Sequence, residues 1–360
     1  MTPFLLKLTN SELGLFQLGH SHYYWASRTG SAWCFPKNKE KIDAISQIFS
    51  TSGPAQMVWN LWRLGIHLGQ VVGLNKNNLG DFGKAIGYPN SSDCACYIGT
   101  PGAYQKAILA VWAQNYVPVI VKMSLSSGAD CKIQHEFRTI TKLKRIDNNL
   151  PIPMVHNLGV WHERPLFTMS PMQGRAMSSA ITEDHINWCK RLFHLEKVSF
   201  LWSDTLCREE FSISINNLPI SVKPIFERSL QLLDNTLPSQ ELPFGWAQRD
   251  FAPWNTRFDK KRLVVFDWEN AASIRPPGYD LIHFHCIQLA LKSKPFHLTT
   301  QTLQTFLRET SPEWLGLEKA IFLLYFLDQA LLYFKAKQES SQGSSRVLNW
   351  MVTQMKVFST

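Results

Sequence analysis

The chain has 360 residues, of which 45% are hydrophobic and 18% charged, a composition typical of globular proteins and sufficient for two or three packed units. No stretch reaches the roughly 18 consecutive apolar residues that a membrane helix requires. The closest, Ala320–Phe334, is interrupted by Asp328 and Gln329 and is predicted to be a buried helix. The first residues, Met1–Lys7, lack the basic start and apolar stretch of a secretory signal, so we expect a cytoplasmic location.

The formal net charge of +9 would suit a protein that binds nucleic acid or an anionic membrane surface. The Lys and Arg residues are spread along the chain, however, and no zinc-finger spacing or aromatic RNA-binding signature accompanies them. Specific nucleic-acid binding is therefore not expected, and a basic surface is compatible with an enzyme that handles anionic phosphates. The seven cysteines are scattered, and Cys94 and Cys96 are too close for a usual metal pair, so we expect reduced thiols.

Residues 1–90 are rich in Trp, Gly and Asn and end in a turn signal at Tyr88-Pro89-Asn90-Ser91-Ser92. We interpret them as an N-terminal extension of unknown role. Within it, Trp59–Gly69 could form an amphipathic helix that completes the core or binds a protein partner.

Residues 91–172 are predicted to be β-rich, with a helix at about Lys132–Leu143 whose apolar residues fall on one face. Runs of β-branched residues predict two strand pairs. These are Ala107–Trp112 with Val117–Met123, and Val155–Val160 with Leu166–Met169.

Residues 173–360 are mainly helical in pattern, apart from one hairpin that pairs Trp254–Phe258 with Leu263–Asp267. The Ser-rich segment Ser340–Ser345 predicts a flexible loop before a last helix at about 346–358. A small β-rich lobe followed by a larger helical lobe predicts a cleft between them, where ligands usually bind.

Acidic and amide side chains gather in this hairpin and in the loop before it. Asp250 and Asn255 stand in a D-x-x-x-x-N arrangement, and Asp267 follows a run of four apolar residues. Phosphoryl transfer requires metal ions on the phosphates and a group that orients the attacking hydroxyl. A carboxylate can accept the hydroxyl proton, while carboxylate and amide oxygens bind Mg²⁺. A loop that supplies the first two residues and a hairpin that returns the third would bring them together.

The full string Gln248-Arg249-Asp250-Phe251-Ala252-Pro253-Trp254-Asn255, with Asp267-Trp268-Glu269, resembles the aminoglycoside phosphotransferase and choline kinase superfamily. Its catalytic loop is H-G-D-x-x-P-x-N, its metal motif is D-W-E or D-F-E, and Pro276–Leu281 is similar to the P-x-x-D-L segment that follows. The resemblance implies an α+β, protein-kinase-like fold of two lobes, a β-rich N-lobe (91–172) and a helical C-lobe (173–360), after the extension. It also implies ATP and Mg²⁺ as cofactors and a small-molecule hydroxyl acceptor, such as a sugar, an amino alcohol or a related metabolite.

The resemblance also implies a role for each residue of the motif. Asp250 would be the catalytic base, and Asn255 and Asp267 would be the Mg²⁺ ligands. We expect Asp280 to brace the loop, by capping a helix that starts at Leu281.

The β-rich lobe is expected to hold ATP. Gly99 and Gly102 lie before its first strand, where glycines let backbone N–H groups approach phosphate oxygens. Lys122 ends a β-branched strand, as the nucleotide-binding lysine does in kinase-like folds, and Glu136 in the next helix is its expected partner. Two other acids could serve as that partner: Asp130 and Glu163.

The segment from Phe167 to Gly174 resembles the strand and hinge between the lobes. Backbone groups of Ser170 to Met172 would then meet adenine. Met169 and Met172 could equally be ordinary core residues.

Gln248 and Arg249 depart from the family motif, because they replace its His-Gly. Gln can still form hydrogen bonds, but the Arg charge is expected to lower the pKa of Asp250 and weaken it as a base. In the helix after Asp280, His283 and His285 point to different faces, so a shared metal site is not expected. Hydrolase and zinc-protease motifs are absent.

Two functions compete with a small-molecule kinase. The fold could serve as a non-catalytic nucleotide-binding or scaffold protein with residues 1–90 as its interaction surface, although Lys122, Asp250 and Asp267 are retained. A basic nucleic-acid binder is the other alternative. An aminoglycoside acceptor would require an acidic pocket, which the net charge of +9 does not favour.

Overall fold

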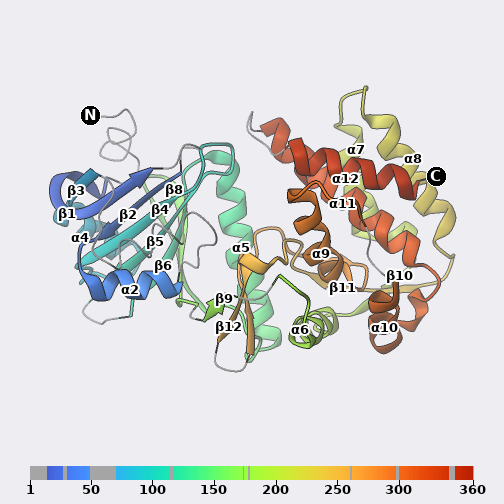
Figure 1. Ribbon diagram of the computed structural model, residues 1–360, viewed down its shortest axis with the longest axis horizontal. Helices are drawn as coiled ribbons and strands as arrows, with labels where there is room; N and C mark the ends of the chain where they lie inside the picture. Colours follow the sequence, from blue (N-terminus) through green and yellow to red (C-terminus); the bar gives the residue numbers. More distant parts are fainter. Residues whose placement is uncertain are drawn as a thin grey trace. The chain divides into compact units, whose positions relative to one another are not determined.

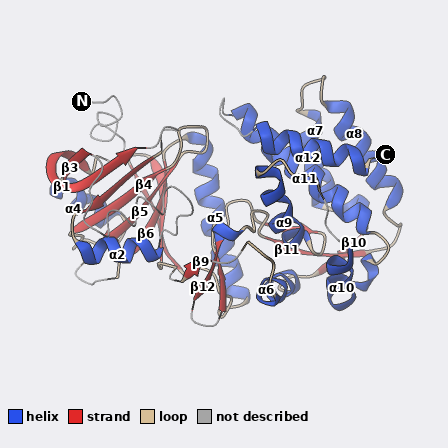
Figure 2. Ribbon diagram, in the orientation of Figure 1, coloured by secondary structure: helices blue, strands red, loops and turns tan. Residues whose placement is uncertain are grey.

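The computed structural model describes residues 14–26, 31–48, 70–113, 117–172, 174–176, 179–259, 262–296, 300–339 and 345–359. The chain divides into two compact units, Met1–Met177 with Arg257–Glu269, and Ser178–Thr256 with Asn270–Thr360. Figure 2 shows that strands gather mainly in the first unit and helices mainly in the second. The segments Met1–Lys7 and Trp59–Gly69 and residues 340–344 of the predicted Ser-rich loop lie outside the described residues.

An antiparallel eight-stranded sheet forms the first unit, in the order β3-β1-β2-β4-β5-β6-β8-β7 (Figure 1). Its strands are β1 (Phe16–Ala26), β2 (Ala32–Pro36), β3 (Gln70–Leu74), β4 (Asp93–Ile98), β5 (Lys106–Trp112), β6 (Val119–Ser124), β7 (Val155–Trp161) and β8 (Arg164–Met169). Both predicted strand pairs are present, as β5 with β6 and β7 with β8. The described part of residues 1–90 continues the same sheet, because β2 pairs with β4.

Helices cover both faces of this sheet. Helix α4 (Lys76–Ala85) packs on one face, and α2 (Lys39–Ile48) and α5 (Ser127–Ile146) pack on the other. Side chains alternate between the two faces along each strand. In β5, for example, Leu109 packs in the hydrophobic cluster on the α4 side, and Ala110 packs in the cluster on the side of α2 and α5.

A small three-stranded sheet in the order β13-β12-β9 accompanies the large one. Its strands are β9 (Arg175–Ala176), β12 (Thr256–Asp259) and β13 (Arg262–Val265). The predicted hairpin is therefore present as β12 and β13. Although it lies within residues 173–360, almost all of it belongs to the first unit.

The second unit is mainly helical. Its helices are α6 (Glu183–His194), η1 (Trp202–Asp204), α7 (Leu206–Asn216), α8 (Lys223–Thr236), η2 (Pro253–Asn255), α9 (Tyr279–Leu291), α10 (Thr300–Thr310), η3 (Pro312–Trp314), α11 (Glu318–Glu339) and α12 (Ser345–Phe358). A three-stranded sheet, β10-β11-β14, contains β10 (Val198–Phe200), β11 (Leu242–Ala247) and β14 (Ala272–Arg275). The core centres on α11, which is buried from Ala320 to Leu331 as the sequence predicts.

Among the described helices, none has both the length and the apolar character needed to cross a membrane. All seven cysteines lie within the described residues and are free thiols. Cys131 is exposed, and the other six are buried.

Candidate active site

Lys122 lies on the face of the sheet that α5 covers. The side chain is 5% exposed, and its Nζ lies 2.6 Å from Oε1 of Glu136. On α5, Glu136 is three residues from Ile133, so both fall on the buried side of the helix. The alternative partner Asp130 is instead ion-paired with Arg164. The structure therefore brings together the two residues that the sequence predicted as a pair.

Asp267 contacts the same lysine, with its Oδ1 3.0 Å from Nζ of Lys122. The next residue, Trp268, donates its backbone N–H to Oε1 of Glu136 at 3.1 Å. Asp267 has a φ of 66°, a left-handed conformation that costs energy for most residues and that Asp tolerates better than most. These contacts with β6 and α5 hold the D-W-E segment in that conformation.

The charges of this cluster favour ionised side chains. Burial by itself raises the pKa of Asp267, but Lys122, Lys106 and Lys132 together outweigh it and lower that pKa to about 2. Burial likewise lowers the pKa of Lys122, but Asp267 and Glu136 outweigh it and the net shift is upward. Asp267 is therefore a carboxylate at neutral pH, the form that binds hard cations.

Three carboxylates of the first unit could hold a cation. Glu136, Asp267 and Glu269 each bring one oxygen within 4.8 Å of the others. Oε2 of Glu136 is buried and has no hydrogen-bond partner among the described residues. Glu269 forms an ion pair with Lys106 at the start of β5. Because Mg²⁺ prefers carboxylate oxygens, this donor set fits a hard divalent cation. Of these three, the sequence predicted only Asp267 as a Mg²⁺ ligand, and the other predicted ligand, Asn255, belongs to the second unit.

The glycine loop connects β4 to β5. Its first residue, Gly99, donates its N–H to the carbonyl of Lys106 at 2.9 Å, so this group takes part in the pairing of β4 with β5. Neither Gly99 nor Gly102 has a positive φ. The β4–β5 pairing therefore uses this N–H, and the approach of backbone N–H groups of the loop to phosphate stays a prediction.

A third glycine, for which the sequence predicted no role, supports this loop. Gly128 is the second residue of α5, and a Cβ there would lie 2.4 Å from the carbonyl oxygen of Ala103. Ser126 also donates its hydroxyl to that oxygen at 2.5 Å. The loop consequently packs against the first turn of α5, and a glycine in that turn is the sequence signal for it.

The predicted hinge follows β8. Ser170 donates its backbone N–H to the carbonyl of Met154 at 2.8 Å, and its hydroxyl lies 3.0 Å from Nε2 of His156. This N–H is therefore used within the first unit, and contact of adenine with backbone groups of Ser170 to Met172 stays a prediction. Met172 is partly buried, and Gln173 lies outside the described residues.

Asp250 and Asn255 belong to the second unit, in the loop after β11 and in η2. Nδ2 of Asn255 donates to both the backbone carbonyl and Oδ2 of Asp250, at 2.9 Å each. The structure thus brings these two residues together. Asp267 belongs to the first unit, and the β12–β13 hairpin connects it to Asn255 along the chain.

Asp280 braces the loop that carries Asp250. Its two carboxylate oxygens accept the backbone N–H groups of Gln248 and Arg249, at 2.8 and 3.0 Å. Burial raises the pKa of Asp280 to about 6, although the two N–H groups offset part of this effect. The predicted brace is confirmed. The predicted helix cap is wrong, because α9 begins at Tyr279 and its N-cap is Gly278.

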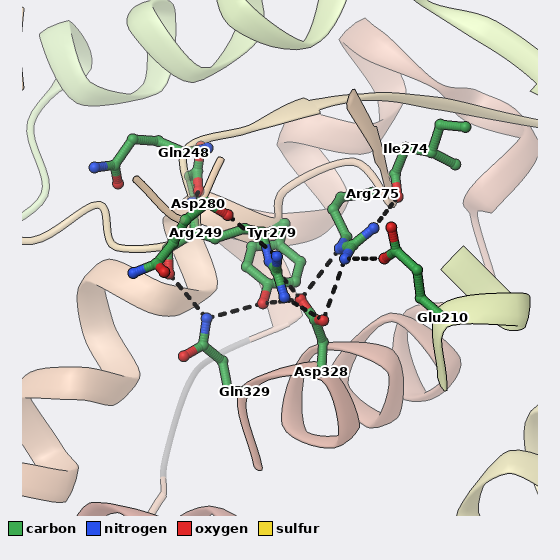
Figure 3. Close-up of polar contacts among 10 residues, drawn as sticks. Glu210, Gln248, Arg249, Ile274, Arg275, Tyr279, Asp280, Asp328 and Gln329 are labelled. Carbon is green, nitrogen blue, oxygen red and sulfur yellow. Dashed lines mark hydrogen bonds and ion pairs between the residues drawn. The ribbon is translucent and has the colours of Figure 1, made fainter. Parts of the chain in front are cut away.

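Gln248 and Arg249, the residues that depart from the family motif, both support this loop. Oε1 of Gln248 accepts the backbone N–H of Asp250 at 2.8 Å. The Arg249 guanidinium binds Asp328 through Nη2 at 2.5 Å and Nε at 2.8 Å (Figure 3). Its charge is therefore matched by Asp328 and is not left beside Asp250 as the sequence suggested.

One neighbour of Asp250 was not predicted from the sequence. Nε2 of His283 lies 3.4 Å from Oδ1 of Asp250, and its Nδ1 lies 3.2 Å from the hydroxyl of Tyr325. From the sequence, His283 was considered only as a metal ligand, and no shared metal site was expected there. Its position three residues after Asp280 on α9 was the available signal, because residues at that spacing share a helix face.

No protein-family model matches the sequence, and no curated protein matches it significantly. Several solved structures do match the fold. Aminoglycoside phosphotransferase APH(4)-Ia, as a thermostable mutant with ADP and hygromycin B, has a TM-score of 0.51 at 13% identity, over 78% of this chain and 97% of that one. The streptomycin–ATP–APH(2")-IIa ternary complex has a TM-score of 0.51 at 13% identity, over 80% and 97%.

Choline kinase LicA from Streptococcus pneumoniae has a TM-score of 0.50 at 14% identity, over 70% of this chain and 89% of that one. At such identities the likeness concerns the fold. The predicted fold class is confirmed: this chain has the protein-kinase-like fold of these phosphotransferases, with an antiparallel β-sheet in its N-terminal part and a mainly helical C-terminal part.

Proposed function

We propose that this chain is an ATP-dependent phosphotransferase that moves the γ-phosphoryl group of ATP to a hydroxyl of a small molecule. The observation that carries the proposal is the cluster of Lys122, Glu136 and Asp267. It unites the strand lysine, the helix acid and the D-W-E aspartate on a kinase-like fold. The Asp250–Asn255 hydrogen bond supports it from the second unit.

Each residue has a distinct task in this proposal. Lys122 binds phosphate oxygens of ATP, and Glu136 fixes the position of its ammonium group. Asn255 and Asp267 are the proposed Mg²⁺ ligands, and Mg²⁺ when bound would neutralise negative charge on the phosphates. Asp250 accepts the proton of the acceptor hydroxyl while the hydroxyl oxygen forms a bond to the γ-phosphorus of ATP. The bond between that phosphorus and the β–γ bridging oxygen breaks, and ADP is released.

The acceptor class is proposed as a sugar, an amino alcohol or a related metabolite. The compared phosphotransferases were solved with hygromycin B and with streptomycin. For this chain, the net charge of +9 does not favour a polycationic acceptor.

Thermal stabilisation by ATP tests the nucleotide site without knowledge of the acceptor. A ligand that binds only the folded state raises the melting temperature. We expect ATP with Mg²⁺ to raise it more than ATP alone, and Asp267→Asn to abolish the Mg²⁺-dependent increment. Asp81→Asn is the matched control, because Asp81 lies exposed on α4 of the same unit. Equal stabilisation with and without Mg²⁺, in the wild type and in Asp267→Asn, would favour the non-catalytic scaffold.

A further inference from the structure

Arg249 has a left-handed backbone, with a φ of 67°. An L-residue with a long side chain pays a steric cost there, and glycine does not. The family motif has glycine at this position, immediately before the aspartate. In this chain, contacts with neighbouring residues must therefore hold the left-handed backbone of Arg249, because no glycine is present to adopt it without strain.

Contacts fix Arg249 at each of its polar groups. Its N–H donates to Asp280 at 3.0 Å, and its carbonyl accepts a hydrogen bond from Nε2 of Gln329 at 2.9 Å. Its guanidinium binds both oxygens of Asp328, and Nη1 donates to the carbonyl of Asn270 at 3.1 Å. Asp328 and Gln329 are consecutive residues of α11, so one turn of that helix holds both the side chain and the carbonyl.

Asp328 is itself the centre of a buried network (Figure 3). It is 3% exposed and binds Nε of Arg275 at 3.1 Å and the hydroxyl of Tyr279 at 2.5 Å. Arg275 also forms an ion pair with Glu210 at 2.8 Å. Isolated charges are expensive to bury, so this carboxylate is stable here only with its cationic partners. A paired carboxylate on a long buried helix is a rigid anchor point.

We propose that Asp328 and Arg249 are positioning residues that set the orientation of Asp250. The anchor on α11 fixes the backbone of Arg249, and the peptide bond from Arg249 fixes the direction in which the Asp250 side chain leaves the chain. In this chain an ion pair replaces the glycine of the motif. The inference rests on the proposed function, because it assigns these residues to the orientation of the proposed base.

Two variants separate the anchor from the backbone conformation. Arg249→Gly removes the anchor, yet glycine adopts the left-handed conformation without strain, and Asp328 keeps Arg275 and Tyr279 as partners. Asp328→Asn keeps the shape and removes the charge, at a greater risk to folding because Arg275 loses its buried partner. The matched control is Asp234→Asn, because Asp234 takes the same two contacts from Arg208, at 2.9 Å each, elsewhere in the second unit.

The first readout is steady-state phosphoryl transfer. We expect kcat to fall about 10- to 100-fold in Arg249→Gly and in Asp328→Asn, with an ATP KM within about twofold of wild type. Arg249→Lys keeps one charged contact and should recover part of the loss. Asp234→Asn should keep the wild-type kcat. A wild-type kcat in Arg249→Gly would overturn the proposal.

The second readout does not require turnover. Amide hydrogen exchange of the peptide spanning residues 248–255 should be faster in both variants than in wild type, and unchanged in Asp234→Asn. Unchanged exchange in Arg249→Gly would refute the anchor even if no acceptor is found. Failure of the proposed function looks different: Asp267→Asn would leave Mg²⁺–ATP stabilisation intact, whatever the exchange rates show.

Discussion

Replacement of Lys122 by Met tests how strongly this lysine stabilises the first unit. Lys122 pairs with the buried Glu136 at 2.6 Å and with Asp267 at 3.0 Å. Together with its neighbours it lowers the pKa of Asp267 from 3.8 to about 2, a shift of roughly 2.5 kcal/mol at about 1.4 kcal/mol per pH unit. The Asp267 side chain is 29% exposed, so solvent screening reduces this to about 1–2 kcal/mol.

The same substitution also removes the cationic partner of Glu136, which further lowers the free energy of unfolding. Removal of one member of a buried ion pair costs about 3–5 kcal/mol, so we expect Lys122→Met to lose at least about 3 kcal/mol of unfolding free energy at neutral pH. The pKa of Asp267 is lower in the folded state, so its contribution is present above about pH 4 and is lost as the pH falls toward 2. The loss of unfolding free energy in Lys122→Met should therefore be about 1 kcal/mol smaller at about pH 3 than at neutral pH.

Urea unfolding followed by tryptophan fluorescence at both pH values measures this deficit. The matched control is Lys84→Met, because Lys84 forms an exposed ion pair with Asp81 in the same unit and should lose less than about 1 kcal/mol. If Lys122→Met loses no more unfolding free energy than Lys84→Met, or if its loss does not depend on pH, the buried ion pairs do not stabilise the first unit as proposed.

Three further predictions concern a glycine, a buried acid and the thiols. Gly128→Ala places a Cβ 2.4 Å from the carbonyl oxygen of Ala103, so the glycine loop must shift, and ATP should bind about tenfold more weakly in a titration of the melting temperature. The folded-state pKa of Asp280 is raised to about 6, so its ionisation removes stability as the pH rises from about 4 through 6. Over this range the melting temperature of wild type should fall relative to that of Asp280→Asn, and parallel curves would contradict the assignment. A thiol reagent should label Cys131 rapidly in the native protein and the six buried cysteines only after denaturation, so fast native labelling of a second thiol would contradict their burial.

Local patterns predicted much of the first unit. The strands β5 to β8 have runs of β-branched and apolar residues, and α5 has a clear apolar face. The pairing of Lys122 with Glu136 was instead implied by the resemblance to kinase-like folds, and the structure brings the two side chains together. Strands β1 to β3 were not predicted, since the Trp- and Gly-rich texture of residues 1–90 does not show a strand alternation as clear as that of β5.

Contacts between distant segments could not be predicted. Asp328 and Gln329 were noted only as an interruption of an apolar run, although they bind a residue about 80 positions earlier in the chain. Two polar residues in an apolar helix indicate that partners exist but do not identify them. For the same reason Arg249 was expected to act on Asp250 next to it, whereas its side chain binds α11.

The most direct test of the proposed function is the transfer of a phosphoryl group itself. The purified protein would be incubated with ATP, Mg²⁺ and a pooled panel of hydroxyl metabolites, and phosphorylated products would be detected by mass spectrometry. We predict a product that requires Mg²⁺, forms with wild type and with the control Asp184→Asn, and does not form with Asp250→Asn; Asp184 is an exposed residue in the first turn of α6. A product that forms equally well with Asp250→Asn would contradict the assignment of Asp250 as the base.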